Sequence, residues 1–223
     1  MKNFRLLVVL LIALSSWSCS IFDSDNIAPG YKAAYKGISS YFFPEENELI
    51  SPEIVDNIPY ASALIRVGKG KKNLIILESI NKNTFNFVSS DSVYFSIKEG
   101  RVISTSGLTN NLREFIEPFS IKRMSAYVEE VVKYVTYYSY DNPELIRLEI
   151  NANFVFVGKE EVDLFTQRKL LSKFEEIIEN EYLGWKRKNI FWLDENGFVW
   201  KSVQNISPKL PQFEIIVTKK PVT

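Results

Sequence analysis

The sequence contains no histidine, and Cys19 is the single cysteine among its 223 residues. Without histidine, the chain cannot form a Ser-His-Asp or Cys-His catalytic site or a histidine-ligated metal site. One cysteine can form neither an intramolecular disulfide nor a thiolate cluster for zinc or an iron–sulfur centre. We therefore predict no catalytic residues, no metal and no cofactor.

The chain also lacks an excess of charge of either sign, because Lys+Arg and Asp+Glu are both 27. A nucleic-acid-binding protein concentrates positive charge, so this balance argues against a nucleic-acid partner. Hydrophobic residues make up 46% of the sequence, which is typical of a folded domain rather than a disordered chain. Aromatic residues reach 14%, a bias that favours β-strands.

The first 18 residues have the pattern of a bacterial export signal. Lys2 and Arg5 precede an unbroken apolar run over residues 6–14. This run is too short to span a bilayer permanently. Cys19 follows directly, at the position of the lipidation cysteine of a bacterial lipoprotein, although the residues before it fit the usual cleavage box poorly. We predict a signal peptide over residues 1–18 and lipid on Cys19. The alternative is a plain secretory signal that leaves a soluble periplasmic protein.

After the signal we expect a short lipidated tether over residues 19–28 and a single β-rich domain over residues 29–223. An anchor of two or three acyl chains holds a protein firmly at a membrane surface. An Asp after the lipidated cysteine often marks retention in the inner membrane, and Ser20 stands there instead. We therefore expect a protein that is lipid-anchored in the outer membrane and faces the periplasm.

The domain begins with helical periodicity and then changes to strands. Apolar residues recur every three or four positions between Pro29 and Pro44, which predicts an N-terminal helix. From Tyr60 onward, alternating or short apolar runs are separated by turn residues, and Asn196-Gly197 is a strong hairpin signal. We predict a mainly β domain, an antiparallel barrel-like or sandwich-like structure. Its expected strands cover residues 61–67, 74–77, 84–88, 93–97, 102–105, 127–140, 145–157, 162–165, 191–193, 198–200 and 213–218.

Three details of this prediction depend on local patterns. Residues 108–118 have the composition of a loop, and Gly158-Lys159 has that of a turn. The segment 170–182 has apolar residues at helical spacing and many Glu and Lys residues, so periodicity alone favours a helix. Residues 145–157 alternate strictly, which predicts one apolar face made of Ile146, Leu148, Ile150, Ala152, Phe154 and Phe156.

Several short motifs stand in a fixed order along the chain. They are Pro59-Tyr60-Ala61-Ser62, Gly100-Arg101-Val102, Thr105-Ser106-Gly107-Leu108, Asn111-Leu112, Gly184-Trp185, Asn189-Ile190-Phe191-Trp192, Gly197-Phe198-Val199-Trp200-Lys201-Ser202 and Ser207-Pro208-Lys209-Leu210-Pro211. In this order they resemble the group 4 capsule polysaccharide lipoprotein family (GfcB/YjbF). The resemblance implies a β-rich, barrel-like domain on an outer-membrane lipoprotein, associated with operons for exopolysaccharide or capsule secretion. It also favours a strand over residues 170–182, which is the interpretation we adopt.

The C-terminal aromatic residues are the best candidates for a binding site. Indole rings stack on sugar faces, and amide or charged groups bond sugar hydroxyls, so this mixture suits polysaccharide or a protein partner. The alternative is that the tryptophans fill the core; we expect Trp192 and Trp200 to be mainly structural and Trp185 to be the more exposed. The candidate binding residues are Arg101, Trp185, Arg187, Asn189, Trp192 and Trp200.

Adjacent carboxylates occur at Glu129-Glu130, Glu160-Glu161 and Glu175-Glu176. Neighbours on a strand face opposite ways, so such pairs cannot act together as the two carboxylates of a glycosidase, and we interpret them as solvated faces. We predict a non-enzymatic envelope lipoprotein that assists exopolysaccharide or capsule secretion by binding a glycan or another secretion protein. The alternatives are a polysaccharide-modifying enzyme that uses carboxylates and a purely structural lipoprotein.

Overall fold

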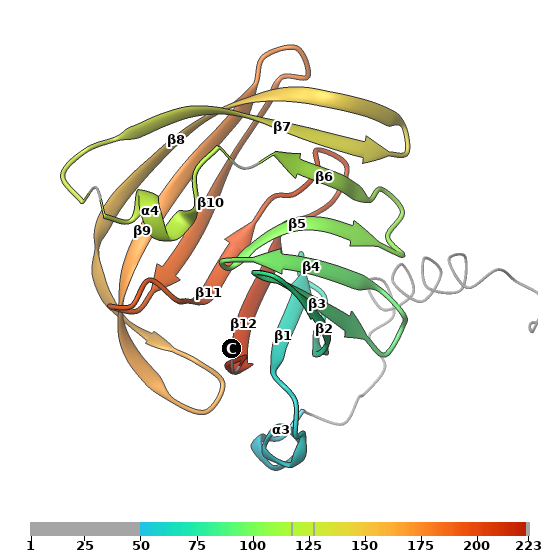
Figure 1. Ribbon diagram of the computed structural model, residues 1–223, viewed down its shortest axis with the longest axis vertical. Helices are drawn as coiled ribbons and strands as arrows, with labels where there is room; N and C mark the ends of the chain where they lie inside the picture. Colours follow the sequence, from blue (N-terminus) through green and yellow to red (C-terminus); the bar gives the residue numbers. More distant parts are fainter. Residues whose placement is uncertain (1–49, 117, 127, 222–223) are drawn as a thin grey trace, which may run out of the picture.

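The computed structural model describes residues 50–221 except 117 and 127. These residues form twelve antiparallel strands and two short helices, which confirms the mainly β prediction (Figure 1). No helix in this part of the chain is long and apolar enough to cross a membrane. The predicted signal peptide, Cys19, the tether and the helix between Pro29 and Pro44 all lie outside the described residues.

The elements follow one another with short connections. The helices are α3 (Pro52–Asn57) and α4 (Ile121–Met124). The strands are β1 (Ser62–Val67), β2 (Lys72–Asn81), β3 (Thr84–Ser89), β4 (Tyr94–Lys98), β5 (Arg101–Ser106), β6 (Leu112–Ile116), β7 (Val132–Asp141), β8 (Glu144–Asp163), β9 (Arg168–Asn180), β10 (Trp185–Leu193), β11 (Val199–Gln204) and β12 (Phe213–Lys219).

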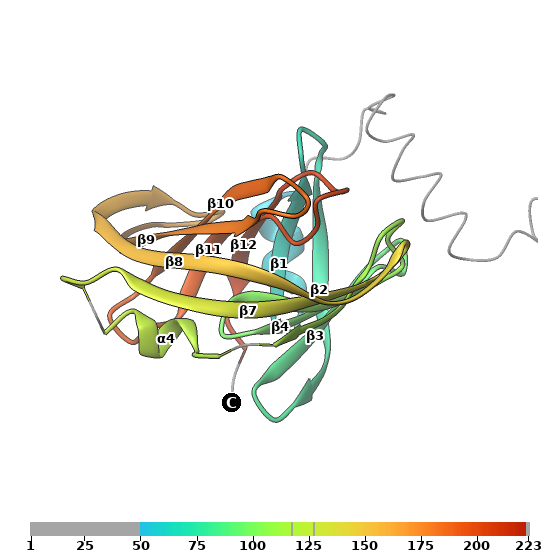
Figure 2. The same ribbon diagram turned by 90° about the horizontal axis from the view of Figure 1, so that it is seen from above.

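The sheet curls into a nearly closed barrel, as Figures 1 and 2 show. The strand order is β5-β4-β3-β2-β1-β12-β11-β10-β9-β8-β7-β6, so β5 and β6 are the two edges. These edges lie side by side, and the backbone N–H of Leu112 donates to Thr105 Oγ1 across the seam at 3.0 Å. A side chain thus replaces part of the missing backbone ladder, which reduces the number of unpaired groups at the edges.

The main core fills the inside of the barrel with alternate residues of each strand. The ring of Phe154 stacks on that of Phe174 at 5.1 Å, and Phe156 packs against the same ring from a half-buried position. The inward face predicted for residues 148–156 is therefore confirmed. Ile146 is an exception, because it is 74% exposed: the next residue has a positive φ of 52° and the β7–β8 ladder shifts register nearby.

A second, smaller core covers the outer surface of the sheet. It joins Leu64 of β1, Ile216 of β12 and Trp192 of β10 to the β8–β9 hairpin. The hairpin contributes Val162 and Leu171, and its tip curves over the barrel wall (Figure 1). Strands in this region therefore bury both faces, which explains why their sequences read as continuous apolar runs instead of alternating.

Three local predictions can be compared with the strands. The segment predicted as a strand at 170–182 is β9, so the strand interpretation is correct and the helical spacing was misleading. Gly158 is not a turn: β8 runs through it with a register shift against β9, which is a bulge. Residues 112–116 form β6 rather than part of a loop, because pairing with β7 supplies the order that local sequence does not.

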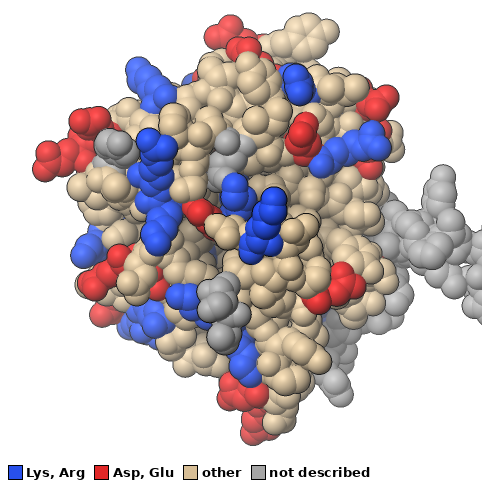
Figure 3. All heavy atoms as spheres, viewed as in Figure 1, with Lys and Arg blue, Asp and Glu red and all other residues tan. Residues whose placement is uncertain are grey.

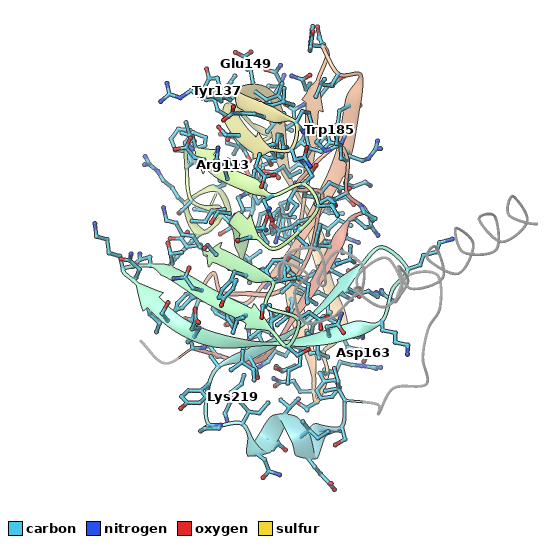
Figure 4. All side chains as sticks on the ribbon, turned by 90° about the vertical axis from the view of Figure 1, so that its right-hand side faces the viewer. Arg113, Tyr137, Glu149, Asp163, Trp185 and Lys219 are labelled. Carbon is cyan, nitrogen blue, oxygen red and sulfur yellow. The ribbon has the colours of Figure 1, made fainter. Side chains whose placement is uncertain are left out.

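Turns after even-numbered strands gather at one end of the barrel, together with α4 and the end of β12, because neighbouring strands are antiparallel. Figure 4 shows the consequence: Lys219 and Asp163 lie toward one end, and Trp185, Tyr137 and Glu149 lie toward the other. We call the first the β12 end and the second the Trp185 end.

Candidate functional site

Two regions of the barrel interior differ from an ordinary apolar core. The first is a buried ion pair between Arg101, the first residue of β5, and Glu176 of β9. Arg101 Nη1 donates to Glu176 Oε2 at 2.9 Å, and Nη2 donates to Oε1 at 2.7 Å, so the pair is bidentate. Both side chains are almost completely buried. This geometry joins two strands that are far apart in the order of the sheet.

Other polar groups complete the coordination of the Glu176 carboxylate. Asn189 Nδ2 on β10 donates to Oε2 at 2.7 Å, and the Tyr134 hydroxyl on β7 donates to Oε1. The Arg101 guanidinium also lies over the rings of Phe115 and Phe191, at 5.0 and 4.9 Å from their centroids. We call Arg101, Glu176, Tyr134 and Asn189 the polar network.

The network fixes the charge states of its members. Burial by itself would raise the pKa of Glu176, but Arg101 and the hydrogen bonds from Tyr134 and Asn189 bring that pKa below its ordinary value. Burial and the Glu176 charge hold the pKa of the Tyr134 hydroxyl well above its ordinary value. Glu176 is therefore ionised and Tyr134 neutral at physiological pH. A carboxylate that is fully bonded and sealed from water is a structural contact rather than a catalytic acid.

The interpretation of Glu175-Glu176 as a solvated face is wrong for one of the two residues. Glu175 points outward and its carboxylate pairs with Lys188 at 3.0 Å, whereas Glu176 points into the barrel. Strand alternation places Glu175 and Glu176 on opposite faces, as expected, and Arg101 stabilises the inward carboxylate of Glu176. The sequence does contain a sign of the inward position of Glu176: it alternates with Phe174 and Ile178 on one face of the strand.

The second region is a cavity of about 430 Å³ at the β12 end. Its walls come from the inner faces of β1, β3, β4, β11 and β12, and its mouth comes from three turns, α4 and the residues after β12. Phe198 and Trp200 lie on one side of it, with their ring centroids 5.1 Å apart. Lys220 Nζ lies 4.3 Å from the Phe198 ring centroid, so positive charge sits directly on the aromatic wall.

The cavity and the polar network meet at Gly100 and Arg101. Gly100 lines the cavity in the β4–β5 turn with a φ of +83°, and a Cβ there would lie 2.3 Å from Cβ of Val199. Only glycine allows this close approach. The neighbouring Gln204 donates to the Gly100 carbonyl at 2.8 Å and accepts from the backbone N–H of Val102 at 3.0 Å. The Gly100-Arg101-Val102 motif thus positions both regions.

The structure separates the three candidate tryptophans. Trp185 is only 4% exposed and packs edge-on against Tyr138, so the prediction that it would be the exposed one is wrong. It is the first residue of β10 and alternation directs its ring inward, despite the Gly and Lys neighbours that suggested exposure. Trp200 is half-buried and lines the cavity, and its Nε1 donates to Asp194 Oδ2 at 2.9 Å.

Trp192 lies on the outer surface in the second core. Its Nε1 donates to Glu160 Oε1 at 2.6 Å, and it pairs across β11 with Lys201 rather than with Trp200. Arg187 is exposed on β10 and donates to the carbonyl of Lys186. Of the six candidate residues, Arg101 and Asn189 therefore come together in the polar network, and Trp185, Arg187 and Trp192 are separate from the network and the cavity. Trp200 lines the cavity and also packs against the second core.

Sequence reasoning missed the cavity mouth. Three lysines line it, Lys82, Lys122 and Lys220, and they come from segments about 40 and 100 residues apart in the chain. A Cβ at Gly197 would lie 2.8 Å from Cγ of Lys122, which shows how closely α4 covers the β10–β11 turn. No linear motif could reveal a set assembled by the turns. Within residues 50–221, apart from the two undescribed positions, no group of acidic side chains could hold a metal ion.

Comparisons with known proteins agree with the motifs. A family model described as "Group 4 capsule polysaccharide lipoprotein gfcB, YjbF" matches residues 35–217. The uncharacterized lipoprotein GfcB of Escherichia coli K12 is 21% identical over 186 residues, which cover 79% of this chain and 84% of GfcB. The crystal structure of the hypothetical lipoprotein YmcC from Escherichia coli K12 superposes with a TM-score of 0.69 at 19% identity, covering 84% of this chain and 95% of YmcC. The last comparison shows a shared fold.

Proposed function

Because the chain belongs to the group 4 capsule polysaccharide lipoprotein family (GfcB/YjbF), we propose that it is a lipid-anchored outer-membrane protein that faces the periplasm and assists exopolysaccharide or capsule secretion or assembly. It acts by binding glycan at the mouth of the cavity. The observation that supports this site is the pair Phe198 and Trp200 beside Lys220, on a cavity of about 430 Å³. Small-molecule sites are commonly of this size.

The chemistry of the mouth suits a polysaccharide. The indole of Trp200 is half-buried with Lys169 over its ring, and the part that lines the cavity offers a surface for sugar C–H groups. The side chains of Asn83, Asn196 and the lysines can bond hydroxyl or acidic substituents. Figure 3 shows several Lys and Arg side chains over the middle of the face on which β12 ends in Figure 1. The polar network, by contrast, offers no accessible group. The site therefore supports binding rather than bond cleavage.

Anchoring is the part of this proposal that cell fractionation tests. Cys19 carries the lipid, so Cys19→Ala releases the protein from the membrane fraction and abolishes incorporation of labelled palmitate. Polymer export then falls because the protein is no longer held beside the export machinery. A variant that stays in the membrane fraction, together with wild type that takes up no palmitate, contradicts the anchor.

Glycan binding is tested with the polysaccharide that the producing cell secretes. Trp200→Ala weakens binding of this polymer to the purified full chain at least tenfold, measured by calorimetry. Tyr182→Ala is the matched control, because Tyr182 is a 91% exposed aromatic residue at the Trp185 end. Equal affinities of both variants and wild type contradict the site.

Binding of another secretion protein is a second candidate, and exposed apolar residues at the Trp185 end favour it. Ile146 near the start of β8 and Tyr182 and Leu183 in the β9–β10 turn are all exposed there. If polymer export depends on these residues and not on Trp200, the protein acts by docking. Export assays of Ile146→Ser and Trp200→Ala in the same strain separate the two functions.

A further inference from the structure

The inner half of the cavity is apolar, in contrast to its mouth. Side chains without a hydrogen-bonding group line it from four different strands. A sugar buried among them would lose its hydrogen bonds to water and gain none, which costs several kcal/mol for a polyhydroxylated ring. An alkyl chain loses nothing of this kind and gains from leaving water. The residues concerned are Ala63, Phe85, Phe87, Ile97, Ile215 and Val217.

The mouth carries an excess of positive charge. Lys82 stands in the β2–β3 turn, Lys122 on α4 and Lys220 just after β12, and all three side chains are exposed. Within the described residues, no ion pair joins any of the three to a carboxylate. Glu99 is the single acidic residue among the lining side chains that are described. Lys201 also lines the cavity, but its charge is met by Glu214 at 3.2 Å.

An apolar interior beneath a basic mouth matches one class of ligand. We propose that the cavity binds an anionic amphiphile, with an alkyl chain against the Phe85, Ile97 and Val217 wall and a phosphate group at Lys82, Lys122 and Lys220. The charge complementarity selects an anionic head, and the predominantly apolar interior, to which Ser202 contributes a hydroxyl, selects an alkyl tail. The inference shares its location with the proposed function: a glycan carried on a lipid phosphate would place its sugars at Trp200 and Phe198.

The experiment uses the full chain as its Cys19→Ala variant, purified without detergent, and titrates it with dodecyl phosphate below its micelle concentration. The expected result is one molecule bound per chain. Inorganic phosphate and dodecyltrimethylammonium are expected to bind at least tenfold more weakly. Comparable binding of inorganic phosphate or of the cationic amphiphile overturns the proposal, and so does the absence of dodecyl phosphate binding.

Variants locate the ligand. Replacing the three mouth lysines together by Gln weakens binding at least tenfold, whereas Lys133→Gln, Lys159→Gln and Lys209→Gln, all exposed elsewhere, leave it unchanged. Val217→Phe fills the cavity and abolishes binding, and Val217→Ala, which keeps the wall apolar and the cavity open, serves as its control. If Val217→Phe fails to fold, the lysine variant still decides. Unchanged binding in the lysine variant overturns the proposal.

Two sources can supply such a ligand, and two further probes distinguish them. Farnesyl phosphate represents a polyprenyl phosphate carrier, and lysophosphatidylglycerol represents membrane phospholipid. Tighter binding of either to wild type than to Val217→Phe supports the cavity as the site, and the tighter probe identifies the source. None of these probes carries a saccharide, so a failure of glycan binding at Trp200 leaves this result intact, and a failure here leaves the glycan result intact.

Discussion

The polar network and the cavity are adjacent in the chain but opposite in character. Arg101 is enclosed by a carboxylate and two rings, while Gly100 beside it lines a cavity that opens to solvent. In the network every strong charge has a partner, so its residues hold the strands in place. At the cavity mouth three lysines have no carboxylate partner among the described residues. Residues of one short motif can thus serve the scaffold and the cavity separately.

The difference also separates the tryptophans. Trp185 completes the filled part of the interior against Tyr138, whereas Trp200 stands at the wall of the cavity. A buried indole contributes to stability by close packing, and a half-buried one that lines a cavity has a surface available to a ligand. The two positions therefore predict different outcomes for the same substitution.

Removing one member of the ion pair has the largest expected effect. Glu176→Gln leaves Arg101 charged and buried without its counter-ion, which lowers the free energy of unfolding by ~3–5 kcal/mol in urea titration. The double variant Arg101→Met/Glu176→Leu recovers most of that loss, because apolar side chains can replace a buried pair. Glu179→Gln, in an exposed pair with Lys186, changes stability by less than about 1 kcal/mol. Equal effects of the two glutamate substitutions contradict the structural role of the network.

Trp185→Ala has the next largest expected effect. It lowers the free energy of unfolding by about 3 kcal/mol, because removing the indole leaves a void beside Tyr138. Thermal or urea unfolding measures it. Because Trp185 lies away from the cavity, the folded variant is expected to bind glycan and dodecyl phosphate as wild type does. Stability within 1 kcal/mol of wild type, together with weaker glycan binding, would reverse the assignment of Trp185 and Trp200.

Lowering the pH tests the role of the polar network, because it protonates the Glu176 carboxylate. The pKa of Glu176 is lower in the folded chain than in the unfolded chain, so its contribution to stability is fully present above the ordinary carboxyl pKa of about 4.3. That contribution is lost as the pH falls through the lower, folded-state pKa. Unfolding titrations between pH 6 and 3 on wild type and on Arg101→Met/Glu176→Leu measure it as the difference in slope. Parallel curves would show that Glu176 is not preferentially ionised in the folded chain.

The smallest effect on stability is expected for Trp200→Ala. Its ring is half-buried, packs at the margin of the second core with Lys169 over it, and its Nε1 bonds the Asp194 carboxylate. The free energy of unfolding therefore falls by about 1–2 kcal/mol, less than for Trp185→Ala. A urea titration beside Trp185→Ala provides the direct contrast. A loss as large as that of Trp185→Ala would mean that Trp200 is part of the core and that the cavity wall needs it for folding.

Much of the fold could be predicted from sequence because alternation and turn residues are local. The Asn196-Gly197 hairpin and the inward face of residues 148–156 are such cases. The β6 strand could not be predicted, since its order comes from pairing with β7 and from the Thr105 contact at the seam. The family resemblance, rather than periodicity, gave the correct strand for β9.

The site was harder to predict than the fold. Arg101 and Asn189 were found by resemblance, but Glu176, which connects them, looked like part of a charged surface. A carboxylate on the inward side of a strand has no sequence signal of its own until its partner is placed. The mouth lysines are similar, because the β2–β3 turn, α4 and the segment after β12 bring them together and each looks like an ordinary solvated residue.

The most direct test of whether the polysaccharide binds at the cavity is hydrogen–deuterium exchange. The wild-type chain is measured with and without the secreted polysaccharide. If the polysaccharide binds at the cavity, exchange slows in the turns that form the mouth, at residues 82–83, 99–100 and 196–198. No change is expected at the Trp185 end, in residues 142–147, which cover the β7–β8 turn and the start of β8, or in residues 181–184. Protection confined to those last two segments, with the mouth unaffected, would contradict binding at the cavity.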